Sequence, residues 1–245
     1  MIGQTVIFDG HRINDLFRVG VIEVGLPSFE PTAVDARRGS LVRGVRMGTS
    51  QIVVPLVAKR VRGHPTRESV STLVSWLDVD GARFLELSGD DGLRRLVVPS
   101  GQPTVDEPEW GDVLTLAFEQ VDPYLYGETK SMAWSSLNYT ARLAVGGDAP
   151  TRPTIEGTLS TSAASGLWLA RLDNATSLGV TIGRYDGHAV RIDCDARTVT
   201  LDGAHTTITL DSDWLELAPG AHTLAVVTGG IDDTALVTWT ERWHA

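Results

Sequence analysis

Residues 118–127 have the sequence Phe-Glu-Gln-Val-Asp-Pro-Tyr-Leu-Tyr-Gly, and this stretch carries the most specific structural signals in the chain. The apolar alternation of residues 113–120 predicts a β-strand that leads into it. Pro123 has a fixed φ and no N–H, so Asp122-Pro123 predicts the end of that strand. Tyr124 and Tyr126 offer flat, amphipathic rings that suit either a subunit contact or the cover of the domain's own core, and both interpretations stay open.

Short alternating apolar runs dominate the first half of the chain and predict a mainly β fold. Besides residues 113–120, they are residues 5–8, 19–24, 51–60, 83–87 and 94–98. One helix is predicted after Pro65, with Thr66 as its N-cap. Its apolar face is formed by residues at i, i+3, i+4, i+7 spacing, namely Val70, Leu73, Val74 and Leu77. The first half is therefore expected to be a β-sheet with one short helix packed on it.

A cluster of glycine and proline at residues 146–153 predicts an exposed linker, because such residues favour loops between domains. We expect two domains, residues 1–145 and residues 146–245. Eight strand-like runs follow at the spacing of an all-β sandwich, and no helix is expected among them. They are residues 154–159, 167–172, 179–182, 189–193, 198–201, 206–210, 222–227 and 235–243.

A stretch rich in glycine and arginine lies between Pro31 and Gly48. Its arginines are Arg37, Arg38, Arg43 and Arg46. One interpretation is a solvated loop that leads into an edge strand, where charges oppose aggregation. The other is an extended arm that docks on an acidic neighbouring subunit, because the guanidinium fork pairs well with carboxylates.

The net charge is −10 and is unevenly distributed along the chain. Residues 1–145 contain 15 Lys and Arg against 18 Asp and Glu, whereas residues 146–245 contain 6 Arg, no Lys and 13 acids. A nucleic-acid reader has the opposite balance, so specific nucleic-acid binding is not expected. No apolar run reaches the length of a membrane helix, and residues 1–10 lack a signal-peptide pattern, so we expect synthesis in the cytoplasm and no membrane partner.

The residues that carry chemistry form no catalytic or metal-binding pattern. Cys194 is the single cysteine, and its flanking Asp193 and Asp195 are expected to raise the pKa of its thiol. The histidines lack metal-ligand spacing, the serines lack a Gly-x-Ser-x-Gly motif, and the paired acids occur next to turn residues. We therefore predict no catalytic residue, no cofactor site and no metal site.

Several motifs, taken in order, resemble the siphophage distal tail (Dit) protein family over essentially the whole chain. The most specific is the Asp-Pro-Tyr-aromatic-Gly signature at residues 122–127. The others are Phe8-Asp9-Gly10, Leu26-Pro27, Trp76-Leu77, the Gly/Pro cluster at residues 147–153, residues 190–193 with Asp202-Gly203, residues 217–220 and residues 239–243. His222 and Glu241 depart from the family pattern, which often has asparagine and a basic residue there.

The resemblance implies a structural protein without enzymatic activity, located at the tip of the virion tail. It implies a hexameric ring built by the first domains, each a β-sandwich with one α-helix, with galectin-like second domains projecting outward. The ring would join the tail tube protein to the tail-associated baseplate proteins and surround the channel for DNA and the tape-measure protein. The candidate subunit-interface residues are the four arginines named above together with Tyr124 and Tyr126.

A carbohydrate-binding, lectin-like module is the alternative from a different functional class. Sandwiches of the galectin type bind sugars on a concave face that carries an aromatic ring and several polar groups. Residues that could supply these groups are Trp168, Arg171, Asn174, Arg184 and Trp214. A tail-tip hydrolase is a third reading, but no motif supports it.

Overall fold

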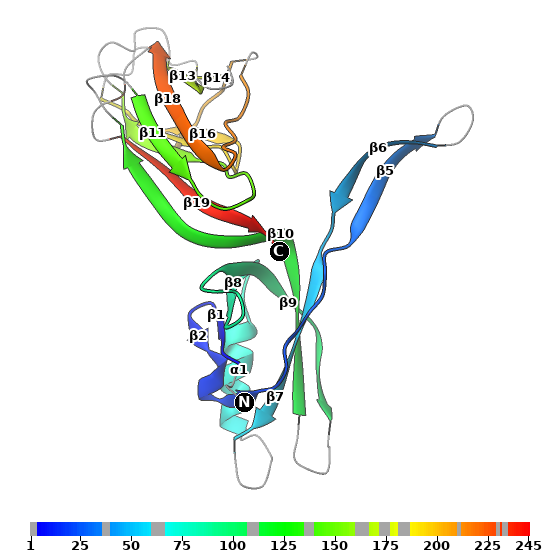
Figure 1. The fold of residues 1–245 in the computed structure, drawn as a ribbon. Coiled ribbons are helices and arrows are strands. Elements are labelled where there is room, and N and C mark those ends of the chain that lie inside the picture. The colour runs from blue at the N-terminus through cyan, green and yellow to red at the C-terminus, as the bar shows by residue number, and fades with distance from the viewer. Residues whose placement is uncertain are drawn as a thin grey trace. The chain divides into compact units, whose positions relative to one another are not determined.

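The computed structural model describes residues 4–35, 40–59, 67–106, 113–134, 140–159, 167–171, 177–180, 187–209, 212–228, 231 and 235–245. The chain forms two compact units, one of Met1–Tyr126 with His244–Ala245 and one of Gly127–Trp243 (Figure 1). Strands dominate both units, and the described residues contain a single α-helix. The predicted fold class, mainly β with one helix, is confirmed. Within the described residues, no helix has the length and apolar character needed to span a membrane.

The first unit is built on one antiparallel sheet with the order β2-β1-β8-β9-β10-β7, and β3 and β4 both pair with the far side of β7. The bounds are β1 Val6–Phe8, β2 His11–Arg12, β3 Phe17–Val19, β4 Glu23–Val24, β7 Ser50–Ala58, β8 Arg83–Leu87, β9 Arg94–Asp106 and β10 Val113–Ala133. A 3₁₀ turn, η1 Ile13–Asp15, connects β2 to β3. The predicted strand at residues 19–24 is thus broken into parts of β3 and β4.

The core of this unit lies on the inner face of the curled sheet. Alternate residues of β7 face it, and Ile52, Val54 and Leu56 are fully buried. The rings of Phe8 in β1 and Phe118 in β10 have centroids 5.3 Å apart, although β8 and β9 lie between these strands in the sheet. The sheet therefore curves until its inner face closes on itself, which fits the sandwich that the resemblance implies.

The single helix, α1 Arg67–Leu77, packs its predicted apolar face against this core. Leu73 is buried, and the ring of Trp76 stacks on His11 with centroids 4.8 Å apart. Val74 differs from the prediction, because it lies at the margin of the apolar face and stays 56 % exposed. The predicted N-cap, Thr66, lies outside the described residues.

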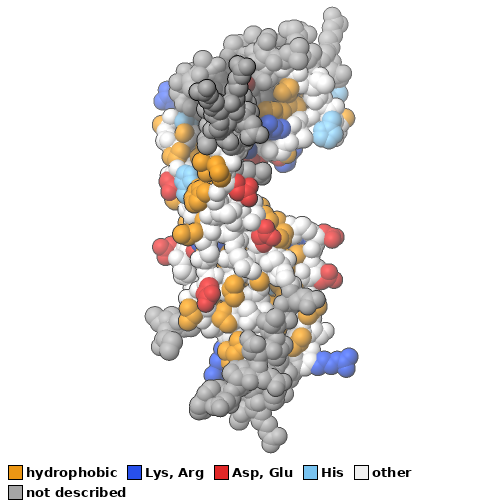
Figure 2. Space-filling model, turned by 90° about the vertical axis from the view of Figure 1, so that its right-hand side faces the viewer, with side chains coloured by type: hydrophobic (Ala, Val, Ile, Leu, Met, Phe, Trp, Pro, Cys, Tyr) orange, Lys and Arg blue, Asp and Glu red, His pale blue; other side chains and the backbone are white. Residues whose placement is uncertain are grey.

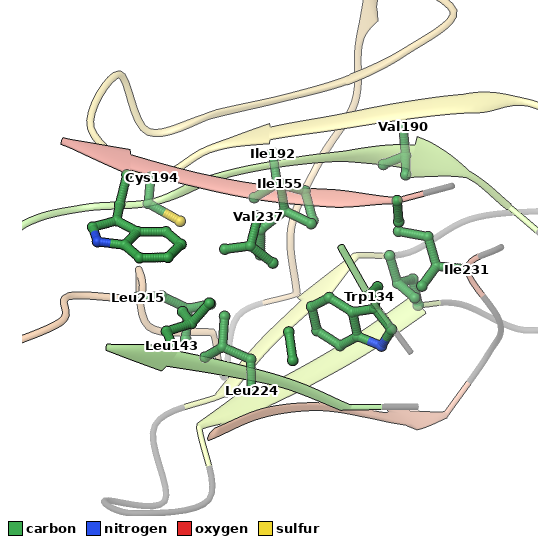
Figure 3. Close-up of a cluster of buried hydrophobic side chains, with 14 of the residues drawn as sticks. Trp134, Leu143, Ile155, Val190, Ile192, Cys194, Leu215, Leu224, Ile231 and Val237 are labelled. Atoms are coloured by element: carbon green, nitrogen blue, oxygen red, sulfur yellow. The ribbon is translucent and has the colours of Figure 1, made fainter. Parts of the chain in front are cut away.

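The second unit is the predicted all-β sandwich, made of two antiparallel sheets. One has the order β17-β16-β15-β12-β19 and continues to the end of β10; the other has the order β11-β18-β13-β14. The bounds are β11 Thr140–Val145, β12 Thr154–Thr158, β13 Leu167–Arg171, β14 Ser177–Val180, β15 Ala189–Asp193, β16 Thr198–Leu201, β17 Ala204–His205, β18 Gly220–Thr228 and β19 Leu236–His244. Figure 3 shows the core, where Ile155 and Val237 from one sheet face Leu143 and Leu224 from the other.

The predicted strand at residues 206–210 is wrong. The short β17 precedes this segment, and Thr206 donates its backbone N–H to Val199 O at 2.9 Å. Thr209 and Ser212 then form a local turn, with Ser212 N donating to Thr209 O at 3.1 Å and the two hydroxyls 2.8 Å apart. Local hydrogen bonds of this kind compete with strand pairing. The alternation of apolar residues gives no sign of this competition.

The Gly/Pro cluster at residues 146–153 is packed inside the second unit, so its interpretation as an exposed linker is wrong. Ala149 and Thr151 are buried, and the backbone of Thr151 exchanges two hydrogen bonds with Leu217 at 2.7 and 2.8 Å. Gly147 has φ +88°, and a Cβ there would lie 2.0 Å from Arg242 O. Glycine is needed here for close backbone approach rather than for flexibility. The division between the compact units lies earlier, at Tyr126 and Gly127 within β10.

Asp122-Pro123 does not end the strand as predicted, because β10 continues through it to Ala133. The pairing of β10 with β9 has a register shift between Gln120 and Leu125. Proline fits such an irregularity, since the backbone there needs no N–H for the ladder. One strand therefore supplies residues to both units.

Candidate subunit interface

The first candidate surface is a β-hairpin in the first unit, formed by β5 Phe29–Asp35 and β6 Ser40–Met47 (Figure 1). The two strands make a sheet of their own, and within the described residues neither pairs with a third strand. The hairpin has the extended form that the arm interpretation requires, and its docking on a neighbouring subunit stays a prediction. Unpaired strand edges expose backbone donors and acceptors that another chain can use.

One face of the hairpin base is apolar. Phe29 pairs with Met47, and Pro31 pairs with Val45. Directly opposed residues share a face of an antiparallel ribbon, and so do residues two positions apart, so these four side chains lie together. Phe29 and Val45 are each 62 % exposed. We call this set of four residues the hairpin face.

Exposed hydrophobic side chains concentrate in and before the hairpin. Among the described residues nine large hydrophobic side chains are exposed, and five of them lie between positions 21 and 45. Leu26 is the most exposed, at 86 %, in the segment between β4 and β5. On the face shown in Figure 2, hydrophobic side chains reach the surface among scattered acidic ones. Exposed apolar side chains that gather in one region mark a candidate interaction surface.

The predicted arginines belong to this hairpin region. Arg37 and Arg38 lie outside the described residues. Arg43 and Arg46 are part of β6, where Arg46 pairs with Glu30 and Arg43 stands at a register shift. The hairpin face was missed by sequence reasoning, because its apolar pairs lie far apart in the chain and meet only through the cross-strand register.

The two predicted tyrosines differ in their surroundings. Tyr126 is buried in the first unit, where its hydroxyl donates to Asp122 Oδ2 at 2.6 Å and its ring meets Phe84 edge-on, with centroids 5.5 Å apart. Its burial fits the cover of its own core, and a role of Tyr126 in a subunit interface stays a prediction. Tyr124 is partly buried and meets the ring of His244 edge-on at 5.6 Å.

A buried polar network supports the strand irregularity at Pro123. Arg95 forms a bidentate ion pair with Asp90, in which Nε donates to Oδ2 at 2.7 Å and Nη2 donates to Oδ1 at 2.8 Å. Its Nη1 donates to Gln120 Oε1 at 2.9 Å. Gln120 Nε2 in turn donates to the carbonyls of Asp122 at 2.7 Å and Tyr124 at 3.2 Å. These bonds satisfy carbonyl oxygens that the register shift removes from the ladder.

The two departures from the resemblance have structural partners. Glu241 is buried in the second unit, where its Oε1 accepts from Lys130 Nζ at 2.6 Å and from the backbone of Gly146 at 2.9 Å. His222 is also buried, with Nε2 2.5 Å from Ala218 O. Both residues therefore stabilise their own unit.

No arrangement for metal binding is found in the part of the chain that the structure describes. It contains no group of three or more His, Cys, Asp or Glu side chains that could hold a metal ion. Burial raises the pKa of the Cys194 thiol to about 12, and Asp193 adds to this rise. The predicted direction is confirmed, but burial is the larger cause. Asp193 itself accepts from the backbones of Asp195 and Ala196 at 3.1 and 2.9 Å, which is a turn contact.

The residues proposed for sugar binding do not form a described site. Asn174 and Arg184 lie outside the described residues, and β13 carries Trp168 and Arg171. Trp214 packs against the core of the second unit. It also lines a hollow of about 380 Å³ whose other walls include Arg197, His205 and three threonines.

A comparison with protein-family models finds a match in the second half of the chain. Residues 146–243 match the family model described as siphovirus-type tail component, C-terminal domain. This part of the chain is therefore similar to the C-terminal domain of siphovirus-type tail components. The resemblance to the distal tail protein family that the sequence indicates is thereby confirmed. A search of curated protein sequences finds no match.

The fold of the whole chain is that of solved distal tail and baseplate structures. The crystal structure of the SPP1 Dit (gp 19.1) protein, described as a paradigm of hub adsorption apparatus in phages that infect Gram-positive bacteria, is similar with a TM-score of 0.74, 20% identity and 98% coverage of each chain. The activated phage P2 baseplate with Ca has a chain with a TM-score of 0.58, 8% identity and 98% coverage of each chain. The corresponding structure with Sr gives 0.57, 8%, and coverage of 98% of this chain and 97% of that one. At these identities the likeness establishes a shared fold.

Proposed function

We propose that the chain is the structural hub of a siphophage tail tip and assembles as a closed ring of six copies. The ring joins the tail tube to the baseplate proteins that attach to the host, and it surrounds the channel for DNA and the tape-measure protein. The likeness to a Dit protein described as a hub adsorption apparatus, over 98% of both chains, supports this role. The match of residues 146–243 to a siphovirus-type tail component supports the location in the virion tail.

The hairpin is the single observation that carries the ring. A two-stranded hairpin alone is marginally stable in water, and within the described residues this one has both strand edges unpaired and an apolar face exposed. A second copy that covers the hairpin removes both the unpaired strand edges and the exposure of the apolar face. A contact between two different surfaces of the same chain closes into a ring when its rotation allows.

The state of the purified protein tests this proposal. Light scattering and electron microscopy are expected to show a sixfold particle with about six times the 26.4 kDa mass of one chain. A species that remains a 26.4 kDa monomer at tens of micromolar, without rings on grids, would count against the hub and favour a free lectin-like module.

Charge reversal of the hairpin tests whether its arginines contribute. Replacing Arg43 and Arg46 together by Glu should weaken assembly and leave the circular dichroism spectrum of the subunit unchanged. The matched control is the double reversal of Arg12 and Arg142, which are exposed on β2 and β11. Equal loss of assembly in both double variants would show a general effect of charge and not a hairpin contact.

Passage of DNA sets a second requirement on the ring. The chain carries a net charge of −10, so the lumen is expected to be neutral to acidic and to let DNA pass without binding. Intact rings should show no measurable duplex binding at about 0.15 M salt, where exposed charges are screened beyond roughly 8 Å. Measurable binding under these conditions would refute this property of the ring.

A lectin-like activity is the second candidate function, and the hollow beside Trp214 is the observation that favours it. An aromatic ring next to polar side chains suits a sugar, and such binding is compatible with the hub role. Glycan-array binding that is lost in the variants Arg197→Ala and His205→Ala would support it. Absence of any retained glycan would remove this candidate.

A further inference from the structure

The hollow beside Trp214 lies next to the hairpin of β16 and β17 in the second unit and has a volume of about 380 Å³. Small-molecule sites in proteins commonly enclose about 300–1,000 Å³, so the hollow has room for a small ligand. Its lining includes a guanidinium, an imidazole, an indole and three threonines, from Arg197, His205, Trp214 and the positions around them. The hollow therefore combines one aromatic ring with several polar groups.

The walls of the hollow are held by the second unit itself. β16 and β17 pair as an antiparallel hairpin, and Thr206 donates its N–H to Val199 O at 2.9 Å, which continues this pairing past the end of β17. The local turn at Thr209 follows, and Trp214 then packs against the core of the unit. Main-chain hydrogen bonds and core packing therefore form the hollow in the absence of a ligand.

The charge of the hollow is opposite to that of the second half of the chain. Residues 146–245 contain 13 acids against 6 arginines. Among the described residues that line the hollow, Arg197 is charged, His205 adds ring nitrogens, and none is Asp or Glu. A single basic group in acidic surroundings favours a small anionic ligand over DNA, because the field of the whole domain repels a long polyanion.

Arg197 is exposed, and within the described residues its side chain has no ion pair or hydrogen bond. The neighbouring carboxylate of Asp195 is bound instead by Arg152 at 3.5 Å and by Arg242 at 3.1 Å. The backbone of Arg197 has φ +54°, a left-handed conformation that glycine and asparagine adopt more easily than arginine. Neither the backbone nor a local partner accounts for an arginine here, whereas an anionic ligand does.

We propose that this hollow binds a saccharide that carries a phosphate or carboxylate group. The guanidinium of Arg197 donates to the anionic oxygens, because its planar fork matches the geometry of both groups. His205 and the threonine hydroxyls bind the hydroxyls of the sugar, and Trp214 packs against its apolar face. This inference rests on the lectin-like candidate function proposed above, to which it adds the charge of the ligand and the residue that binds this charge.

A matched panel of sugars tests the ligand class with the full chain. Glucose, galactose and N-acetylglucosamine are each compared with their anomeric phosphates, and the first two also with glucuronate and galacturonate. Ligand-observed NMR titration at millimolar concentration measures binding. In at least one set the anionic sugar should bind at least tenfold more tightly than its neutral parent. Inorganic phosphate should bind at least tenfold more weakly than that anionic sugar.

Variants of Arg197 test the residue. Arg197→Gln should weaken binding of the anionic sugar by tenfold or more and leave the weak binding of the neutral parent unchanged. Arg197→Lys should give an intermediate loss, because it keeps the charge but not the fork. The matched control is Arg142→Gln, which removes an exposed arginine from β11 in the other sheet of the unit. This control should bind like the unmodified chain.

The outcomes separate this site from the hub. Equal affinity for neutral and anionic sugars, or undiminished binding in Arg197→Gln, would overturn the assignment of the anion to Arg197. Binding of inorganic phosphate as tight as that of the sugar phosphate would overturn the saccharide. Absence of binding by every anionic member of the panel would overturn the site, and rings in the same sample would leave the hub standing. A monomeric chain that binds the anionic sugar would overturn the hub and support the site.

Discussion

Asp122 shows how one side chain holds an interrupted strand together. Its Oδ1 accepts the backbone N–H of Tyr124 at 3.1 Å, and its Oδ2 accepts the hydroxyl of Tyr126 at 2.6 Å. Pro123 between them has no N–H to offer. The Asp-Pro-Tyr-aromatic signature is therefore explained by local hydrogen bonding in the first unit, without any appeal to a partner.

Removal of the Tyr126 hydroxyl is expected to cost stability. The variant Tyr126→Phe loses a hydrogen bond to a carboxylate, which contributes about 1.5–3 kcal/mol to the free energy of unfolding. Urea unfolding followed by circular dichroism measures the loss. The variant Asp122→Asn changes the other partner of the same hydrogen bond. Its control is Asp80→Asn, which makes the same change at an exposed position. A change below about 0.5 kcal/mol in Tyr126→Phe would mean that the bond does not contribute.

Cys194 is expected to be unreactive and to influence alkaline stability. Because its folded pKa is about 12 against an ordinary value of 9.0, the thiol stays protonated in the folded protein when an unfolded chain would ionise. Its contribution to stability is therefore fully present below pH 9.0 and is lost progressively as the pH rises towards 12.

Two measurements check this prediction. Ellman's reagent at pH 8 should label Cys194 only after denaturant is added. The free energy of unfolding should also fall more steeply with pH above about 9 in the unmodified chain than in Cys194→Ala. Rapid labelling of the folded protein, or identical slopes in the two proteins, would contradict the buried, protonated thiol.

At the scale of elements, the glycines of two turns give a matched test of close backbone packing. Gly147 and Gly187 have similar φ values, +88° and +77°, but only Gly147 has a neighbour, Arg242 O, that a Cβ would meet at 2.0 Å. Gly187→Ala should cost about 1 kcal/mol for the left-handed backbone alone. Gly147→Ala should cost at least about 2 kcal/mol more, because the clash displaces the backbone of β19. Thermal unfolding of the two variants should separate these values, and equal melting temperatures would contradict the packing role.

Strand prediction succeeded where one alternating run forms one strand. Residues 83–87, 189–193 and 198–201 were predicted with the bounds that the structure has, because each has a clear in-and-out pattern. The hairpin strands β5 and β6 were missed, because their apolar residues alternate with arginine, glycine and proline. The edge strand β11 was missed since residues 140–145 precede the glycine cluster that was interpreted as a linker.

The candidate interface was predictable only in part. Arginine content pointed to the hairpin region, but the apolar hairpin face depends on the register that sets Phe29 against Met47. An apolar groove of about 520 Å³, lined by Leu77, Pro99 and Leu116, depends on α1 lying beside β9 and β10, which are separated from it by many residues in the chain. Such surfaces result from packing between elements that are far apart in the sequence. The hydrophobic periodicity of a single element therefore does not predict them.

For the whole molecule, the position of the unit boundary makes a prediction about fragments. A fragment of residues 127–243 should be a folded, all-β monomer. A fragment of residues 146–245 lacks β11 and the core residues Trp134, Ala141, Leu143 and Val145, so it should be much less stable or insoluble. Size exclusion and circular dichroism of both fragments check this. Equal stability of the two would place the structural boundary after β11.

The first unit holds both ends of the chain, since Ala245 donates its N–H to Pro123 O at 3.1 Å and His244 meets Tyr124. The second unit is thus an insertion, entered along β10 and left along β19, and these two strands are neighbours there through Thr129 and Thr240. A module whose own entry and exit strands are adjacent could take its place without moving either chain end. The inserted module can therefore be exchanged for another, while the first unit keeps its own core and its own contacts.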